Sequence, residues 1–419
     1  MQKLLADWQN VLSSRVRMSS RRRTRCVAVE GCCHGELDSI YRSVERTEKE
    51  AGVKVDLLII CGDFQAVRNV QDLGCMAVPP KYRKLGDFAR YYSGSKKAPV
   101  LTIFVGGNHE ASNHLHELYF GGWVCPNIYY LGQSGVINAG GIRIAGLSGI
   151  YKQEDYTKPL FERLPYNDST LRSIYHVRQF EELKLLEVKD QMDVCLSHDW
   201  PMGIERHGNL RQLLERKKHF REDVDTGRLG SAPARRILEA MKPAYWFSAH
   251  LHTKYAALYD HASKNKQNED EIELDLDDGG PELSKVTPKT TKFLALDKCL
   301  PRRDFLQILN IPIWTDEPMV LSYDKEWLSI LRLYHENNQP LGDVGSSVWE
   351  EARRWVLLNI LDLTVPLNFQ ITAPIQADGM SSKKAPKQYN NPQTSDFCRL
   401  LDIPNPLQGT SPIGGGKLK

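Results

Sequence analysis

Five short polar motifs, each directly following an apolar run that predicts a β-strand, constrain this 419-residue chain more than any other feature. The apolar runs are aliphatic or β-branched, as in strands buried on both faces of a layered α/β protein. Because the carboxyl ends of such strands open onto one crevice, we expect the motif side chains to converge in space. The motifs are Gly31-Cys32-Cys33-His34-Gly35, Gly62-Asp63, Gly106-Gly107-Asn108-His109-Glu110, Ser197-His198-Asp199 and Ala249-His250-Leu251-His252.

The remaining pattern is also that of alternating strands and helices. A helix is predicted over 39–50 with Asp38 as its N-cap, and a helical region is predicted around 322–336. This alternation indicates the α/β class. Strands are predicted over 26–30, 56–61, 100–105, 142–147, 192–196, 245–249 and 291–297.

The residue types in the motifs match metal chemistry. Imidazole, carboxylate and amide oxygen are ligands for Zn, Fe and Mn, whereas a thiolate favours Zn or Fe. His250 and His252 are two residues apart, so both lie on one face of an extended segment. Asp63 could bridge two cations about 4 Å apart, the separation that is typical of two-metal phosphoesterases.

Each motif alone has a plainer interpretation. A histidine at a strand end is more often a hydrogen-bonded structural residue, Gly62-Asp63 alone is usually a turn, and Asn108 could cap a helix. Cys32 and Cys33 could be buried thiols. Five such motifs in this order favour the metal site. The other histidines keep plain interpretations. His114 and His116 are predicted to lie on different faces of a helix. Four further histidines are predicted to be exposed: His207, His219, His261 and His335.

Composition excludes several classes of protein. Hydrophobic residues make up 41% and charged residues 26%, an ordinary globular balance, and no apolar run is long enough to span a bilayer. A net charge of +3 does not by itself indicate a nucleic-acid partner. Nine cysteines without a C-x-x-C pair or a visible signal peptide indicate reduced thiols in an intracellular protein.

Three segments lack a core-forming pattern. Residues 1–24 form a basic Arg- and Ser-rich leader that we expect to be disordered; a nuclear-import patch, a transit peptide and an upstream extension before Met18 stay open. Residues 261–290 form an acidic linker or insertion. Residues 373–419 are rich in Pro, Gly, Ser, Asn and Lys and are expected to be a disordered tail.

In order and wording, the motifs resemble the calcineurin-like metallophosphoesterase superfamily, whose pattern runs D-x-H, G-D, G-N-H-[DE], H and G-H-x-H. Within it the chain resembles the RNA lariat debranching enzymes. Cys32 stands where most of the superfamily has the first Asp, a replacement that the debranching family shares. Longer stretches carry this resemblance: 31–38, 61–69, 76–82, 107–114, 197–201 and 245–252.

The resemblance implies an α/β/β/α sandwich of two mixed sheets over 25–260 and a family-specific C-terminal domain over 291–372. It also implies two divalent metals, with Fe²⁺ and Zn²⁺ expected and Mn²⁺ able to substitute. One metal would be held by Cys32, His34, Asp63 and His252, and the second by Asp63, Asn108, His198 and His250.

The implied activity is hydrolysis of the 2′,5′-phosphodiester at the branchpoint of excised intron lariats, which gives linear RNA for turnover. A metal-bound hydroxide would attack phosphorus while His109 protonates the leaving 2′-oxygen; orientation of Asn108 or a carboxylate is the alternative role for His109. Residues 148–178 resemble the family's lariat recognition loop, with an ordinary surface connection as the alternative. Its expected RNA contacts are Tyr151, Tyr175, His176 and Arg178.

Branched intron RNA is the implied partner, with spliceosome-associated proteins as further candidates and neither DNA nor a membrane expected. Localisation is expected to be nuclear, with shuttling to the cytoplasm left open. Two other functions remain: a calcineurin-like phosphodiesterase or phosphatase of broader specificity, and a non-catalytic RNA-binding protein. Competition between branched RNA, linear RNA and phosphopeptide distinguishes lariat debranching from a phosphoesterase of broader specificity. Metal analysis distinguishes an enzyme from a non-catalytic RNA-binding protein.

Overall fold

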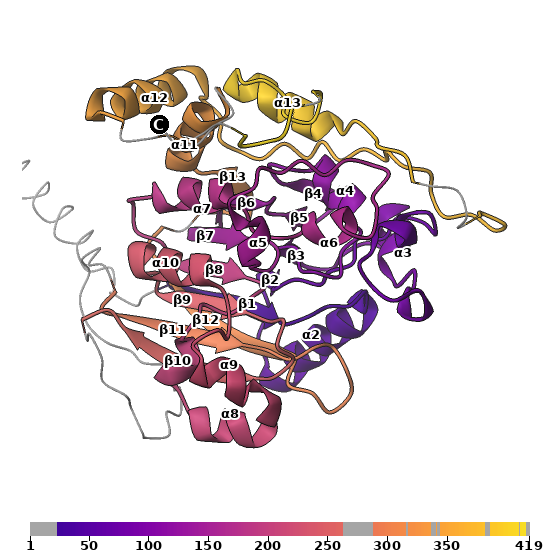
Figure 1. The fold of residues 1–419 in the computed structure, drawn as a ribbon, viewed down its shortest axis with the longest axis vertical. Helices are drawn as coiled ribbons and strands as arrows, with labels where there is room; N and C mark the ends of the chain where they lie inside the picture. Colours follow the sequence, from indigo (N-terminus) through magenta and orange to yellow (C-terminus); the bar gives the residue numbers. More distant parts are fainter. Residues whose placement is uncertain are drawn as a thin grey trace, which may run out of the picture.

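Two β-sheets lie face to face in a computed structural model of the chain, with helices on their outer faces (Figure 1). The structure describes residues 23–262, 288–315, 317–336, 341, 344–381, 386–409 and 411–415. The expected leader and acidic linker lie outside these residues, apart from 23–24, 261–262 and 288–290. No helix in the described ranges combines the length and apolarity needed to cross a bilayer.

The first sheet has six strands in the order β12-β1-β2-β3-β5-β4. Its four central strands run parallel, and β12 and β4 pair antiparallel at the edges. β1 begins earlier than predicted because Arg23 pairs with Ile313 of β12, so residues 23 and 24 are not part of a disordered leader. The strands are β1 (Arg23–Glu30), β2 (Leu57–Ile60), β3 (Leu101–Phe104), β4 (Gly122–Cys125), β5 (Ile128–Tyr130) and β12 (Leu306–Ile313).

The second sheet has seven strands in the order β10-β11-β9-β8-β7-β6-β13. Its central four run parallel, and the strands at both ends pair antiparallel. Every predicted strand is confirmed, although β1 begins at Arg23 and not at Cys26. The strands are β6 (Ser134–Ala139), β7 (Ile142–Leu147), β8 (Val194–Ser197), β9 (Tyr245–Ser248), β10 (Tyr255–Asp260), β11 (Thr290–Ala295) and β13 (Leu321–Tyr323).

Side chains along the strands alternate between two cores, as the two-residue period of a strand requires. Val27 and Ile59 lie between the sheets and share a core with Phe247 of the opposite sheet. Their neighbours Ala28 and Leu58 instead belong to the core beneath the helices of the first sheet. Burial on both faces explains why these strands read as continuous apolar runs.

Helices cover the outer face of each sheet. α2 (Leu37–Ala51) and α3 (Phe88–Tyr92) pack on the first sheet. α7 (Gln179–Leu186), α10 (Ala232–Met241) and α11 (Lys325–Glu336) pack on the second. The shorter elements are α4 (Ser112–Glu117), α5 (Gln153–Tyr156), α6 (Thr170–Ser173), α8 (Leu210–Arg216), α9 (Arg221–Asp225), η1 (Asp72–Cys75), η2 (Pro80–Tyr82), η3 (Ile204–His207) and η4 (Lys218–Phe220).

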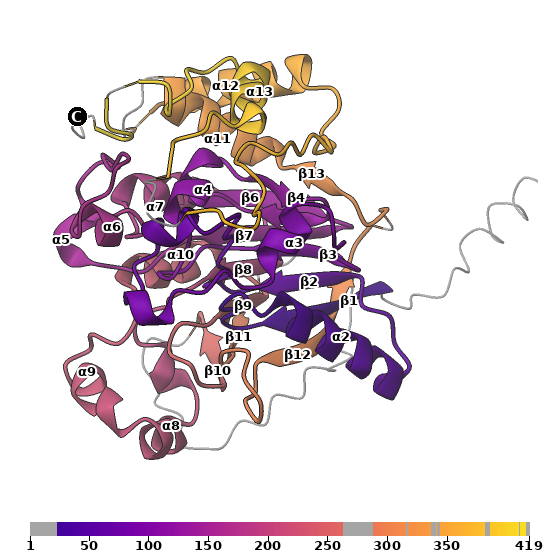
Figure 2. The same cartoon turned by 90° about the vertical axis from the view of Figure 1, so that its right-hand side faces the viewer.

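The C-terminal region is ordered, so the prediction of a disordered tail over 373–419 is wrong for most of its length. α12 (Ser346–Asn359) and α13 (Pro392–Leu401) join α11 at one end of the molecule, opposite α8 and α9 (Figures 1 and 2). Phe397 and Leu401 of α13 are buried in the core of the second sheet. The polar composition of this region misled the prediction, because the few apolar side chains that hold it, such as Phe397 and Leu401, lie on the packed face of α13.

A C-terminal strap, residues 366–376, runs back over the first sheet. The Tyr92 hydroxyl donates to the carbonyl of Ala373 (3.1 Å), and the Asn69 amide donates to the carbonyl of Pro374 (2.8 Å). Arg68 lies beneath the strap and pairs with Asp72 and Glu117, at 2.9 Å each. All three charged side chains of this trio are buried.

The side chain of Gln393, in α13, pairs with the backbone of the edge strand β4. Its Oε1 accepts from the Trp123 N–H and its Nε2 donates to the Trp123 carbonyl, both at 2.8 Å. The amide therefore makes the two hydrogen bonds that a neighbouring strand would make there.

Two smaller predictions are also wrong. Asp38 does not cap a helix, because α2 already begins at Leu37, and its carboxylate instead accepts from the Tyr91 hydroxyl (2.8 Å). His335 is only 2% exposed, because α11 packs it against Tyr119 and near the ammonium of Lys184 (3.3 Å). The predicted exposure of His219 is confirmed.

Candidate metal centre

The five motifs converge at the carboxyl ends of five parallel strands from both sheets. Cys32 and His34 follow β1, Asp63 follows β2, and Asn108 and His109 follow β3. His198 follows β8, and His250 and His252 follow β9. The convergence expected from the layered α/β pattern is therefore present.

Four of these residues adopt the left-handed backbone conformation that side chains other than glycine rarely take. The φ angles are 47° at His34, 46° at Asp63, 60° at His250 and 50° at His252. Such turns cost free energy, and they cluster where a chain must aim a side chain in a fixed direction. Here they turn each side chain from the strand end towards the shared centre.

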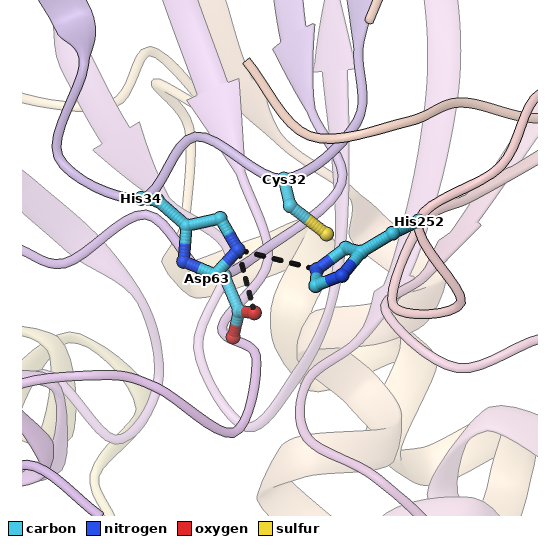
Figure 3. Close-up of side chains that lie close together, drawn as sticks. All are labelled: Cys32, His34, Asp63 and His252. Carbon is cyan, nitrogen blue, oxygen red and sulfur yellow. Dashed lines mark hydrogen bonds and ion pairs between the residues drawn. The ribbon is translucent and has the colours of Figure 1, made fainter. Parts of the chain in front are cut away.

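The first cluster consists of Cys32, His34, Asp63 and His252, whose ligand atoms all lie within 4.8 Å of one another (Figure 3). The Nε2 atoms of His34 and His252 are 3.2 Å apart, and His34 Nε2 is 3.6 Å from Asp63 Oδ2. Two nitrogens bonded to one cation at 2.0–2.1 Å in tetrahedral geometry would be about 3.3 Å apart. The cluster therefore has the donor set and the spacing of a cation site.

The second set shares Asp63 with the first. His198 Nε2 lies 3.4 Å from Asp63 Oδ1 and 3.3 Å from Asn108 Oδ1. The His250 ring lies beside the His198 ring, with centroids 5.0 Å apart. His198 Nδ1 is 2.8 Å from the carbonyl of Cys61, which orients Nε2 towards Asp63. The two oxygens of Asp63 thus face different ligand sets.

The electrostatics of the site favour neutral imidazoles around one carboxylate. Burial alone would raise the pKa of Asp63, but the surrounding imidazoles, foremost His198, hold it below its ordinary value. Burial lowers the pKa of His198 to about 4 and of His252 to about 3, so both are neutral at physiological pH. A neutral imidazole has a free lone pair, which metal ligation requires.

Two glycines leave the space that this arrangement occupies. A Cβ on Gly62 would lie 2.2 Å from His198 Nδ1, and one on Gly107 would lie 2.3 Å from Asp63 Oδ1. Both contacts are far shorter than van der Waals contact. No side chain larger than glycine fits beside the shared carboxylate.

Glu110 organises the loops without facing the cluster, a role that sequence reasoning missed. Its buried carboxylate accepts from the backbone N–H groups of Phe64 (2.8 Å), Gln65 (2.7 Å) and Gly107 (2.8 Å). Burial raises the pKa of Glu110 to about 7. Its place in the third motif was the sequence signal, but two of its three partners, Phe64 and Gln65, directly follow the second motif.

His109 lies at the edge of the cluster and is partly exposed. Its backbone N–H donates to Asp63 Oδ1 (2.9 Å), and its ring centroid is 5.5 Å from that of His34. The ring therefore faces the same space as the ligands.

The expected RNA contacts fall into two groups. Tyr151, Tyr175 and His176 are partly exposed, and Tyr175 lines a small cavity together with Gly107 and Glu110. His176 Nδ1 is 2.7 Å from Asp155 Oδ2, so part of its hydrogen-bonding capacity is used inside the loop.

Arg178 is not placed to meet RNA, and we correct that expectation. Its side chain is only 3% exposed, because its guanidinium pairs with Glu162 (2.5 Å) and donates to the carbonyls of Ser173 and Asp155. These bonds tie the start and the end of the 148–178 loop together.

A sixth strand end reaches the centre and was missed. The backbone at Asp297-Lys298, which follows β11, forms a bridge with Cys32. The signal was present, because Asp297 and Lys298 follow the apolar run Phe293-Leu294-Ala295-Leu296 directly, as the motif residues follow their strands.

This fold and site define a class of protein. Residues 27–254 match the calcineurin-like phosphoesterase family. Residues 288–406 match the lariat debranching enzyme C-terminal domain, which extends past the predicted boundary at 372 and includes α13.

Curated relatives agree with both matches. The chain is 51% identical to the lariat debranching enzyme of Homo sapiens, over 90% of this chain and 69% of that protein. It is 49% identical to that of Danio rerio, over 90% and 66%, and 43% identical to that of Arabidopsis thaliana, over 93% and 88%. The chain thus spans about two thirds of the length of the two vertebrate relatives. It belongs to the lariat debranching enzyme family.

Proposed function

We propose that this chain hydrolyses the 2′,5′-phosphodiester at the branchpoint of RNA lariats and releases linear RNA. The observation that carries the proposal is the four-ligand cluster of Cys32, His34, Asp63 and His252 at converging strand ends. The names of the relatives, all lariat debranching enzymes, support the choice of branched RNA over other phosphodiesters.

The residues present fit two divalent cations that share Asp63. Cys32, His34 and His252 complete the first ligand set, and Asn108, His198 and His250 complete the second. A sulfur donor favours Fe²⁺ or Zn²⁺ at the first position, with Mn²⁺ able to substitute. Bound cations would supply an activated water and neutralise charge on the phosphate.

His109 is suited to protonate the leaving 2′-oxygen. Its backbone N–H is anchored on Asp63, while its ring stays partly exposed beside His34, where a substrate can reach it. An imidazole is an efficient proton donor near neutral pH. Asn108, one residue earlier, would meanwhile orient its amide oxygen through its contact with His198.

The test is the turnover of branched RNA by a His109→Gln variant. We expect kcat to fall by about 10²–10⁴ while metal content stays as in the unaltered protein, because His109 is not a ligand. His219→Gln, at an exposed histidine elsewhere in the chain, is the matched control and should leave kcat unchanged. Loss of metal in His109→Gln would assign His109 to ligand orientation instead.

Two further measurements separate the other functions. If linear RNA or a phosphopeptide is cleaved as fast as branched RNA, the protein is a phosphoesterase of broader specificity. If elemental analysis of protein purified without oxygen finds no metal, the site is that of a non-catalytic RNA-binding protein.

We also propose that the protein acts in the nucleus with spliceosome-associated proteins, because excised lariats arise where introns are removed. Fluorescence imaging of the tagged protein, with and without inhibition of splicing, tests this. Exclusion from the nucleus under both conditions would contradict it.

A further inference from the structure

The β11–β12 loop, residues 296–305, packs backbone to backbone against the loop that carries Cys32. The Cys32 N–H donates to the carbonyl of Asp297 (3.3 Å), and the Cys299 N–H donates to the carbonyl of Cys32 (3.1 Å). A Cβ on Gly31 would lie 2.1 Å from the Asp297 carbonyl, so the two loops could hardly be closer. Lys298 is therefore fixed in register with a residue of the metal centre.

Three basic residues lie near the buried carboxylate of Asp297. Asp297 accepts from the backbone N–H of Lys298 (2.7 Å) and pairs with Arg303 (3.2 Å). Lys217, at the end of α8, lies within range of all three charges: burial lowers its pKa, Asp297 partly offsets this effect, and Arg303 and Lys298 lower the pKa again. We call Lys217, Lys298 and Arg303 the cation patch; with one carboxylate between them, it carries a net positive charge.

The ammonium of Lys298 has no hydrogen bond or ion pair with any residue in the ranges that the structure describes. Lys298 nevertheless lies next to the metal centre, because its backbone forms the bridge with Cys32. A lysine without a counter-ion next to a phosphoesterase site is available to a phosphate.

The topology places the cation patch away from the recognition loop. In the second sheet, β11 lies on one side of the pair β9 and β8, whereas β7, which leads into the 148–178 loop, lies on the other. The histidines that follow β8 and β9 lie between them. A branchpoint nucleotide carries three phosphodiesters, so its RNA arms must leave the site in more than one direction.

We propose that the cation patch, with Lys298 at its centre, binds a backbone phosphate of one RNA arm on the side of the metal centre opposite the recognition loop. This inference rests on the proposed function, because that function identifies the ligand as branched RNA. It assigns Lys298 to substrate binding and leaves proton transfer to His109.

The test is the salt dependence of RNA binding by Lys298→Met, measured by fluorescence anisotropy in the His109→Gln background so that the RNA stays intact. Each phosphate contact to single-stranded RNA contributes about 0.7 to the slope of log Kd against log salt concentration. We expect that slope to fall by about this amount and Kd at low salt to rise roughly fivefold or more. Lys298→Arg keeps the charge and should keep most of the affinity.

Lys325→Met is the matched control. Lys325 is an exposed lysine at the start of α11 and lines a cavity with Asp193, which precedes β8, so it lies at the other end of the sheet. Its loss should leave the slope unchanged. Equal slopes in Lys298→Met and Lys325→Met would overturn the inference, as would a Lys298→Arg variant that binds as weakly as Lys298→Met.

Two outcomes keep this test apart from that of the proposed function. If Lys298→Met loses metal, Lys217→Met, outside the backbone bridge to Cys32, tests the same patch, and an unchanged slope there overturns the inference. If the unaltered protein fails to cleave branched RNA, the proposed function fails, while the slopes measured with linear RNA still decide whether the patch binds phosphate.

Discussion

Cys32 brings sulfur into a cluster whose other donors are nitrogen and oxygen. Burial, with a contribution from the charge of Asp63, raises the pKa of its thiol well above the ordinary value. The backbone N–H of His250 donates to its sulfur (3.2 Å) and partly offsets this effect. The thiolate therefore needs a bound cation, and cation binding must release the Cys32 proton.

Replacing Cys32 with Asp should shift the metal preference of the first position from Zn²⁺ towards Mn²⁺. We expect Zn²⁺ affinity to fall roughly tenfold relative to Mn²⁺ affinity, because a carboxylate is a harder ligand than a thiolate. Chelator competition with each metal measures the two affinities. Cys33→Ser is the control, since Cys33 is equally buried but packs under α2, away from the cluster. An unchanged ratio of affinities in Cys32→Asp would mean that sulfur does not ligate the metal.

The convergence of the candidate ligands could be predicted because each one follows an apolar strand and because the strand ends of such sheets meet. The partners of Glu110, Arg178 and Lys298 could not be predicted in this way. Arg178 is buried by Glu162, a contact within one loop, and Lys298 depends on the pairing of two loops from distant parts of the chain. Sequence periodicity contains no information on which loops touch.

At the scale of elements, the C-terminal strap packs on a buried ionic group. Arg68 pairs with Asp72 and Glu117, and its Nη1 lies 3.5 Å from Thr372 Oγ1 of the strap. The stretch 61–69 was singled out for its resemblance to a family, and its last two residues turn out to bind the strap and not the substrate.

Arg68→Met should therefore destabilise the fold without touching the metal ligands. Removing one member of a buried ionic group leaves unpaired charges, which costs about 3–5 kcal/mol. Urea denaturation measures the free energy of unfolding. Arg235→Met removes a half-exposed pair with Glu239 and should cost less than about 1 kcal/mol. Equal losses in the two variants would show that the strap does not depend on Arg68.

The central strands were easier to predict than the ends of strands or the C-terminal helix α13. The central strands are confirmed because their apolar runs have no other stable environment. The start of β1 and the whole of α13 were missed, because Arg23 pairs with β12 and α13 presents only a narrow apolar stripe to the core. Both depend on tertiary partners that are remote in sequence.

At the scale of the whole molecule, buried histidines link stability to pH. Burial lowers the pKa of His114 and His116 to about 3 each. Because these folded-state values lie below the unfolded value of about 6.5, the stability that they contribute is fully present above that pH. It is lost as the pH falls from about 6.5 towards 3, because the unfolded chain then takes up protons that the folded chain does not.

His116→Gln should flatten this dependence. Between pH 6 and pH 5, the free energy of unfolding should fall less steeply than in the unaltered protein, by up to about 1.4 kcal/mol per pH unit. Denaturation in the presence of a chelator measures both slopes without a contribution from metal release. His219→Gln, at an exposed position, should keep the original slope. Parallel slopes in all three proteins would contradict the assignment to His116.

The side-chain amide of Gln393 affects whether copies of this protein can aggregate through the edge of the first sheet. An open edge strand invites backbone pairing with another molecule, which is a common route to aggregation. On β4, the Trp123 N–H and carbonyl are already occupied by one side chain. Gln393 lies on α13, a helix that the sequence analysis did not predict. This one side chain thus protects the β4 edge of the first sheet from pairing with another molecule.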